Sequence, residues 1–285
     1  MYHSRCVHTA EDRRMKTTDR GNTEGKAILT VSFGTSYHET REKTIGAIER
    51  SLAAAFPEYE VRRAFTSRRI LEKLRARDAL VIDSVEEAME RLIQDGIRTV
   101  LVQPTHIIGG LEYEKMADLV RSYQTSFSEF CVGKPLLSRD IDYDEAVYAV
   151  AEENRIFCSS QTAVVLMGHG TEHAANMCYE RLEKRFAVLG YQNYILGTVE
   201  SVPSLDHVRR RAKALGVRRL LLVPFLIVAG EHVLRDMAGE TDSWKEKLQA
   251  DGFEVECILR GLGEYGGIQK IWIRHAEEAL QGLQD

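Results

Sequence analysis

The 285-residue sequence lacks the features that mark disulfide-rich, zinc-ribbon and membrane proteins. Its five cysteines are scattered, odd in number and free of any C-x-x-C spacing, which argues against a disulfide framework or a zinc ribbon. The longest apolar run, Leu220–Gly230, is interrupted by Pro224 and is too short to span a bilayer. We therefore expect a cytoplasmic protein with reduced thiols and no membrane segment.

The sequence also lacks a net positive charge and the common nucleotide-binding and nucleophile motifs. The formal net charge of −5 argues against nucleic acid as the main partner. The glycine pattern Gly21–Ala27 is one residue too short for a P-loop, and Ala27 stands where Ser or Thr would hold magnesium. No G-x-S-x-G elbow occurs in the sequence, so serine hydrolysis has no support. We expect no nucleotide cofactor.

Residues 1–25 are polar, charged and aperiodic, and they lack the apolar core of a signal peptide. We predict that they form a disordered N-terminal tail. From Lys26 onward, short apolar runs alternate with amphipathic segments of helical period, a pattern that predicts an α/β fold with parallel sheets covered on both faces. The predicted strands are 26–33, 60–65, 99–103, 163–167, 194–199, 219–223 and 254–259.

A weak internal repeat divides the chain. The segment Gly96–Pro104 parallels Gly216–Pro224 with an offset of 120 residues, and 31–35 parallels 167–171 with a different offset. The repeat predicts two similar Rossmann-like α/β halves, residues 26–158 and 159–285, each with a parallel sheet flanked by helices. Both halves would end their strands at a shared central cleft. Chance similarity between apolar strands is the alternative, since Gly and Pro recur at the ends of elements in α/β folds.

Polar residues that follow predicted strands are the candidates for chemistry. They are Glu112, His169 and His232, and the offset of 120 residues pairs Glu112 with His232. In open α/β sheets the ligand crevice lies outside the carboxyl ends of the strands. Two imidazoles and one carboxylate can hold a divalent transition metal and leave positions open. The competing interpretation is that these are ordinary surface or core residues.

Weaker candidates lie nearby in the sequence. His173 follows His169 by four residues, but Gly170 stands between them, so we expect at most a role in supporting a ligand. His106 shares the loop of Glu112. Two further candidates are more typical of solvated surfaces. One is His38 at a helix start, and the other is the pair of arginine runs 209–211 and 218–219. The arginines could bind substrate carboxylates.

Several segments carry a resemblance to a known family. They are Val31–His38, Arg63–Ser67, His106–Lys115, Met167–Gly170, Val228–His232 and Gly261–Glu264. In order and spacing, from about Lys26 to the C-terminus, they resemble the anaerobic cobalt chelatases of cobalamin biosynthesis. These enzymes insert cobalt into sirohydrochlorin without ATP, and their fold is shared with ferrochelatases.

The resemblance implies that His169, His232 and Glu112 are the metal-binding and catalytic residues, with Co²⁺ as the substrate metal. The cleft would bind a flat, carboxylate-rich tetrapyrrole, and a carboxylate or imidazole would accept the pyrrole protons. One departure is Gly109–Leu111, where the family has Asn-Gly-Asp or a similar sequence; it leaves the glutamate in place. Iron or nickel insertion and a non-catalytic tetrapyrrole or metal carrier are the alternatives. A homo-oligomeric state stays open.

Overall fold

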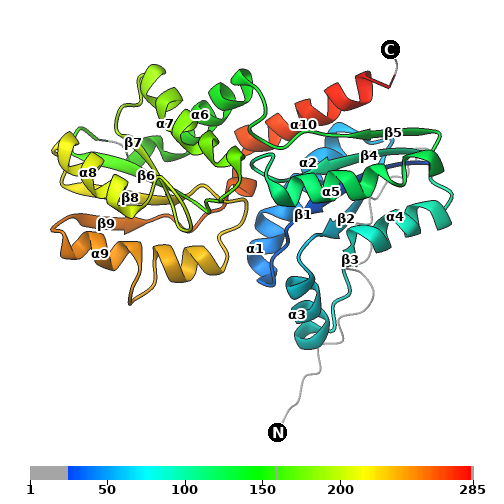
Figure 1. Cartoon of the computed structure of the whole chain (residues 1–285), viewed down its shortest axis with the longest axis horizontal. Coiled ribbons are helices and arrows are strands. Elements are labelled where there is room, and N and C mark those ends of the chain that lie inside the picture. Colours follow the sequence, from blue (N-terminus) through cyan, green and yellow to red (C-terminus); the bar gives the residue numbers. More distant parts are fainter. Residues whose placement is uncertain (1–24, 158, 284–285) are drawn as a thin grey trace, which may run out of the picture.

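The computed structural model describes residues 25–157 and 159–283 and contains two parallel sheets that lie beside each other (Figure 1). The first sheet has the strand order β3-β2-β1-β4-β5, and the second has the order β7-β6-β8-β9. The strands are β1 (Lys26–Ser32), β2 (Glu60–Phe65), β3 (Asp83–Ser84), β4 (Thr99–Pro104), β5 (Glu129–Val132), β6 (Thr162–Gly168), β7 (Tyr194–Thr198), β8 (Arg219–Pro224) and β9 (Glu254–Cys257). The predicted tail lies outside the described residues, apart from Gly25.

The two-sheet α/β architecture is confirmed, and the strands expected from apolar runs are present. Two short strands, β3 and β5, are not predicted by the sequence. They contain 2 and 4 residues, too few to show a period against the flanking polar residues. Their pairing partners, β2 and β4, supply the edge on which they form.

Helices connect the strands and cover both faces. They are α1 (His38–Lys43), α2 (Ile45–Ala55), α3 (Arg68–Asp78), α4 (Val85–Gln94), α5 (Leu111–Arg121), α6 (Asp140–Asn154), α7 (Met177–Val188), α8 (Leu205–Leu215), α9 (Trp244–Ala250) and α10 (Gly266–Gln281). A capping box begins α4: the Ser84 hydroxyl accepts from the Glu87 N–H at 3.2 Å, and Glu87 accepts from the Ser84 N–H at 2.8 Å. No helix in the described part of the chain is long and apolar enough to cross a membrane.

The repeat is visible in the register of the strands. Val31 of β1 lies opposite Pro104 of β4, and Met167 of β6 lies opposite Pro224 of β8. These are the pairs that the sequence repeat aligns. The agreement continues past the strand ends. The Thr105 N–H donates to the Val31 carbonyl at 2.9 Å, and the Phe225 N–H donates to the Met167 carbonyl at 2.8 Å.

One hydrophobic core joins the sheets. It contains Ile28 and Leu101 from the first sheet, Val164 and Leu221 from the second, and buried residues of α6 and α10. Helix α10 contacts α6, α2, β4 and β5, while α6 contacts α7. The last helix of the chain therefore packs on the first sheet (red in Figure 1), although the predicted division at residue 158 assigns it to the second half.

A buried ionic cluster links α6 to α10. The carboxylate of Asp142 is fully buried and accepts from Arg274 Nη2 at 2.6 Å, and its Oδ1 lies 3.0 Å from His275 Nε2. Burial alone would raise the pKa of Asp142, but hydrogen bonds from His275, Arg274 and the backbone of Arg139 lower it well below its usual range. The two helices are thus tied by charge as well as by apolar packing.

Candidate metal and active site

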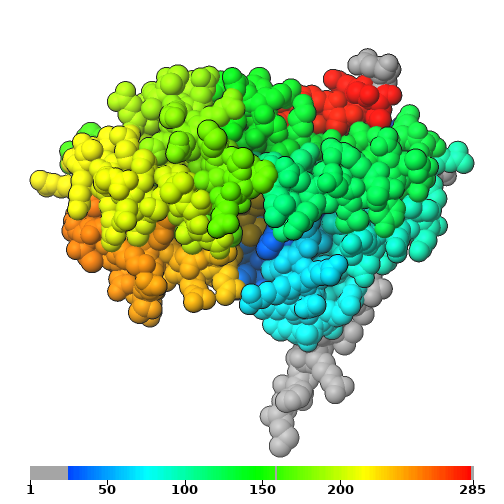
Figure 2. Space-filling view, viewed as in Figure 1, coloured from blue at the N-terminus to red at the C-terminus, as the bar shows by residue number. Residues whose placement is uncertain are grey.

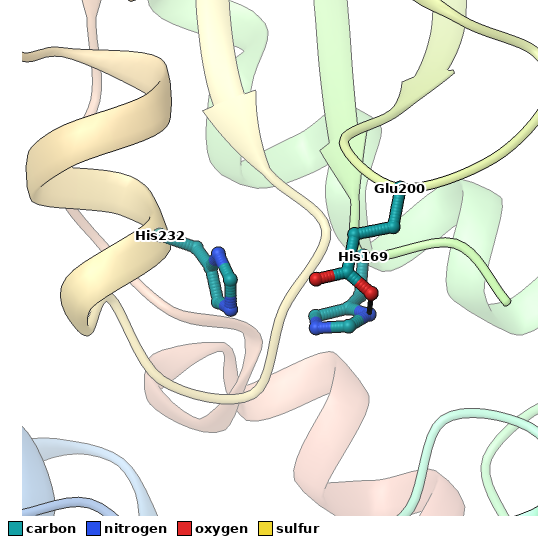
Figure 3. Close-up of side chains that lie close together, drawn as sticks. All are labelled: His169, Glu200 and His232. Carbon is teal, nitrogen blue, oxygen red and sulfur yellow. Dashed lines mark ion pairs between the residues drawn. The ribbon is translucent and has the colours of Figure 1, made fainter.

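Three loops at the carboxyl ends of β6, β7 and β8 bring His169, Glu200 and His232 together (Figure 3). The backbone explains part of this arrangement. The N–H of residue 199 donates to the carbonyl of residue 168 at 3.1 Å, and the Glu200 N–H donates to the His169 carbonyl at 2.9 Å. These bonds continue the pairing of β6 with β7 past the strand ends, so Glu200 is held beside His169.

The spacing of these side chains fits a single metal ion. One ligand atom from each of His169, Glu200 and His232 lies within 4.8 Å of the other two, and the imidazole centroids are 4.8 Å apart. Ligand atoms with bonds of about 2 Å to one ion lie roughly 3 to 4 Å apart, so a small closure completes the site. The side chains are 44%, 55% and 42% exposed, which leaves coordination positions open toward solvent.

Hydrogen-bond partners fix which nitrogen of each imidazole is free. His232 Nδ1 lies 2.7 Å from a carboxylate oxygen of Asp236, and His169 Nδ1 lies 2.9 Å from the Gly170 carbonyl and 3.5 Å from Glu200. Carbonyl and carboxylate oxygens only accept, so both Nδ1 atoms carry the proton. The lone pair is then on Nε2 in both rings. A carboxylate that accepts from a metal-binding imidazole also orients it.

Close packing explains the glycines around His169. A Cβ at Gly168 would lie 2.4 Å from the Tyr179 ring, and Gly170 has φ +87° and no room beside Ser201. Burial raises the pKa of the Tyr179 hydroxyl, and backbone hydrogen bonds from Gly170 and His169 offset part of that increase. Tyr179 therefore packs against the turn and fixes the backbone on either side of His169.

Glu112 does not belong to the group of converging ligand atoms. It is an exposed residue in the first turn of α5 and is not one of the three residues whose ligand atoms converge. The same turn does reach the second sheet, because Glu114 Oε1 lies 3.5 Å from His173 Nε2. His173 thus faces α5 of the first half, and its Nδ1 accepts from the Ala175 N–H at 3.2 Å.

The remaining histidine candidates have other surroundings. Both ring nitrogens of His106 are shielded from solvent and have no hydrogen-bond partner among the described residues. Burial lowers the pKa of His106 to about 4, so its imidazole is neutral near pH 7. Its ring lies edge-on to Tyr113, with centroids 6.2 Å apart. His38 is exposed at the start of α1, as the sequence predicts.

Arginines in the predicted runs form ion pairs within the second half. On α8, Arg209 donates to Asp251 at 2.6 Å, and Arg211 donates to Glu183 at 3.2 Å. The run 218–219 lies at the amino end of β8, opposite the end that leads to His232. These arginines are therefore remote from the converging side chains.

Sequence reasoning missed two members of the site, Glu200 and Asp236. Glu200 directly follows the predicted strand 194–199, so the rule that selected the histidines would have found it if applied to every strand. Asp236 follows His232 by four residues, the spacing of neighbours on a helix face. Both signals were present, although an exposed acidic residue at such positions is common.

Comparison with known proteins gives the family. The family model for cobalt chelatase (CbiK) matches residues 26–281. The chain belongs to the cobalt chelatase family. The sirohydrochlorin cobaltochelatase of Salmonella typhimurium is 39% identical over 256 residues, covering 90% of this chain and 96% of the relative. Sirohydrochlorin cobaltochelatase CbiKC of Nitratidesulfovibrio vulgaris is 34% identical over 263 residues, covering 91% and 92%.

Two solved structures share the fold of this family member. SirB from Bacillus subtilis with Fe3+ superposes with a TM-score of 0.63 at 16% identity, covering 91% of this chain and 98% of SirB. CbiX, described as the terminal enzyme for biosynthesis of siroheme in denitrifying bacteria, gives a TM-score of 0.54 at 15% identity, covering 89% and 99%. At these identities the likeness concerns the fold alone.

Proposed function

We propose that this chain inserts Co²⁺ into sirohydrochlorin without using a nucleotide. The observation that carries the proposal is the convergence of His169, Glu200 and His232 at the carboxyl ends of one sheet, in a member of the cobalt chelatase family. Two full-length relatives are named sirohydrochlorin cobaltochelatases. Imidazole and carboxylate groups are suitable ligands for Co²⁺.

The metal substrate is held by the two Nε2 atoms and one oxygen of Glu200. In Figure 3 one Glu200 oxygen contacts His169 Nδ1, while the other faces the space between the two rings. Two neutral ligands and one anionic ligand leave a bound divalent ion with a net positive charge and open positions. Ring nitrogens of the tetrapyrrole can occupy those positions before the protein ligands leave.

Proton balance supports the same set of residues. Insertion of one Co²⁺ releases two pyrrole protons, and departure of the ion frees one lone pair on His169 and one on His232. Each freed imidazole can accept one proton. Glu112 lies on the helix that contacts His173 of the second half through Glu114, and it would take one of the two protons in place of an imidazole, on the other side of the ring.

Iron and nickel compete for the same set of ligands. Nitrogen and oxygen donors bind several divalent ions, and availability in the cell decides between them. Metal competition with equal amounts of Co²⁺, Fe²⁺ and Ni²⁺ under anaerobic conditions measures the preference. We expect cobalt insertion to dominate in keeping with the family.

Variants of the proposed ligands test the function. We expect His169→Ala and His232→Ala to reduce the insertion rate about 100-fold or more, because loss of one ligand misplaces the ion. Glu200→Gln should reduce it roughly tenfold through weaker metal binding. Glu112→Gln should lower kcat more than it raises KM for sirohydrochlorin. Absorption spectra of the tetrapyrrole report the rate, and Glu180→Gln, at an exposed position on α7, is the matched control.

Wild-type rates in both histidine variants would contradict the assignment. Equal losses in Glu200→Gln and Glu180→Gln would show that Glu200 acts only through surface charge.

A further inference from the structure

The repeat gives each residue of the metal-binding group a counterpart in the first sheet. The shared register aligns residue 31 with residue 167, and therefore Phe33 with His169. The Ser67 N–H donates to the Phe33 carbonyl at 3.3 Å, just as the Glu200 N–H donates to the His169 carbonyl at 2.9 Å. The counterparts of His169, Glu200 and His232 are thus Phe33, Ser67 and Glu112.

The two sets of loops face each other. A Cβ built on Gly230 would lie 3.9 Å from Thr35 Oγ1, so the loop after β1 touches the loop after β8. Phe33 precedes Thr35 by two residues, and His232 follows Gly230 by two; two residues span at most about 7 Å. Figure 2 shows a hollow between the halves, bordered by blue atoms of the first and yellow to orange atoms of the second. The loop that carries Phe33 is therefore in contact with the loop that leads to His232.

Phe33 combines a fixed backbone with an unburied ring. Its side chain is 54% exposed, and Tyr148 at 52%, on α6, is the other exposed aromatic residue in the described part of the chain. Gly34 has φ +98°, and a Cβ there would lie 2.5 Å from the Phe65 ring. The carbonyl of Phe33 is held by Ser67. An exposed phenyl group on a backbone that is held at a strand end is suited to packing against a flat ligand.

We propose that Phe33 packs against a face of the tetrapyrrole, so that the first sheet seats the macrocycle while the second delivers the metal. The inference rests on the proposed function. Among the counterparts in the first half, Ser67 caps α3 by accepting from the Ile70 N–H at 3.4 Å. Glu112 has a carboxylate that can accept a pyrrole proton. Phe33 has an aromatic face on which the conjugated macrocycle can stack in an offset arrangement.

The test separates macrocycle binding from metal binding. We expect Phe33→Ala to weaken binding of metal-free sirohydrochlorin about tenfold, through lost stacking and apolar contact, and to leave the Kd for Co²⁺ within twofold of wild type. Phe33→Tyr should restore binding because it keeps the aromatic face. Tyr148→Ala removes an equally exposed ring at a different place and should change neither constant. Absorption titration measures the tetrapyrrole, and calorimetry measures Co²⁺.

If the wild-type protein inserts cobalt but Phe33→Ala still binds sirohydrochlorin normally, this inference is overturned and the proposed function is not. An equal loss in Tyr148→Ala, or a Co²⁺ affinity that falls together with the tetrapyrrole affinity, overturns this inference as well. A wild-type protein that neither binds nor metallates sirohydrochlorin overturns the proposed function, and this inference with it. Thermal unfolding of Phe33→Ala and Phe33→Tyr shows whether each variant is folded when it is assayed.

Discussion

At the scale of single residues, hydrogen-bond acceptors decide how the two histidines can act. His232 donates its Nδ1 proton to Asp236 and His169 donates to the Gly170 carbonyl, so both present Nε2. His106 shows the opposite case. Its imidazole has no acceptor among the described residues, and burial lowers its pKa to about 4. In His169 and His232 the Nδ1 atom is hydrogen-bonded to an acceptor, so the Nε2 atom is the one available to bind a metal.

Asp236 is the positioning residue for His232, and its removal tests that role. We expect Asp236→Ala to weaken Co²⁺ binding about 10- to 100-fold, because the imidazole loses both its fixed tautomer and its orientation. The Kd for sirohydrochlorin should stay unchanged. Calorimetric titration with Co²⁺ measures the effect, and Asp206→Ala on the exposed face of α8 is the control. An unchanged Co²⁺ affinity in Asp236→Ala would refute the positioning role.

The sequence predicted two of the three converging residues. His169 and His232 follow the strongest strand signals, and the glycines beside His169 and before His232 mark tight turns. Glu200 has no such flanking signal, and its place depends on a backbone bond past the strand end. Glu112 stays a prediction from the repeat, since a position on a helix turn does not determine where a long side chain reaches.

At the scale of elements, the periodicity of α6 and α10 predicts helices but not the sheet that each one covers. An apolar stripe on a helix predicts that this face is buried, but it does not predict which sheet or helix covers it. The structure pairs α10 with the first sheet and links it to α6. The helical segment after β1 is also broken at Thr44, into α1 and α2. The Thr44 hydroxyl donates to the Thr40 carbonyl at 2.5 Å, and such back-bonding bends helices.

The ionic cluster between α6 and α10 predicts a pH-dependent stability. The pKa of Asp142 is lower in the folded state than in the unfolded chain, so its contribution is present above about pH 3.9 and is lost as the pH falls below it. Asp142→Asn leaves Arg274 and His275 without their buried partner. We expect it to lower the free energy of unfolding by about 3 kcal/mol at pH 7.

Urea unfolding of wild type and Asp142→Asn at several pH values provides the measurement, and the difference should shrink toward pH 3. Asp140→Asn alters an exposed carboxylate two residues earlier in the same helix and should change stability by less than about 0.5 kcal/mol. Equal effects of both substitutions, or a difference that grows on acidification, would contradict the account.

At the scale of the whole molecule, two sheets with the same register carry different chemistry at their facing ends. The α/β class, the repeat and the parallel pairing of strands in each half follow from the pattern of apolar runs and turn residues. The shared core of Ile28, Leu101, Val164 and Leu221 could not be predicted, because the packing of one half on the other depends on surfaces that no local pattern describes. The difference between the facing loops, with Phe33 on one side and His169, Glu200 and His232 on the other, has the same origin.

The most direct test of the central claim follows cobalt from the protein to the ring. Protein loaded with Co²⁺ and freed of nucleotide is mixed anaerobically with a twentyfold excess of sirohydrochlorin and Co²⁺, and absorption spectra record the metallated product over time. We predict product in many equivalents per protein, faster than the uncatalysed control and independent of added ATP, with His169→Ala reduced to the uncatalysed rate. Product that stops at one equivalent, or that requires ATP, would contradict the account.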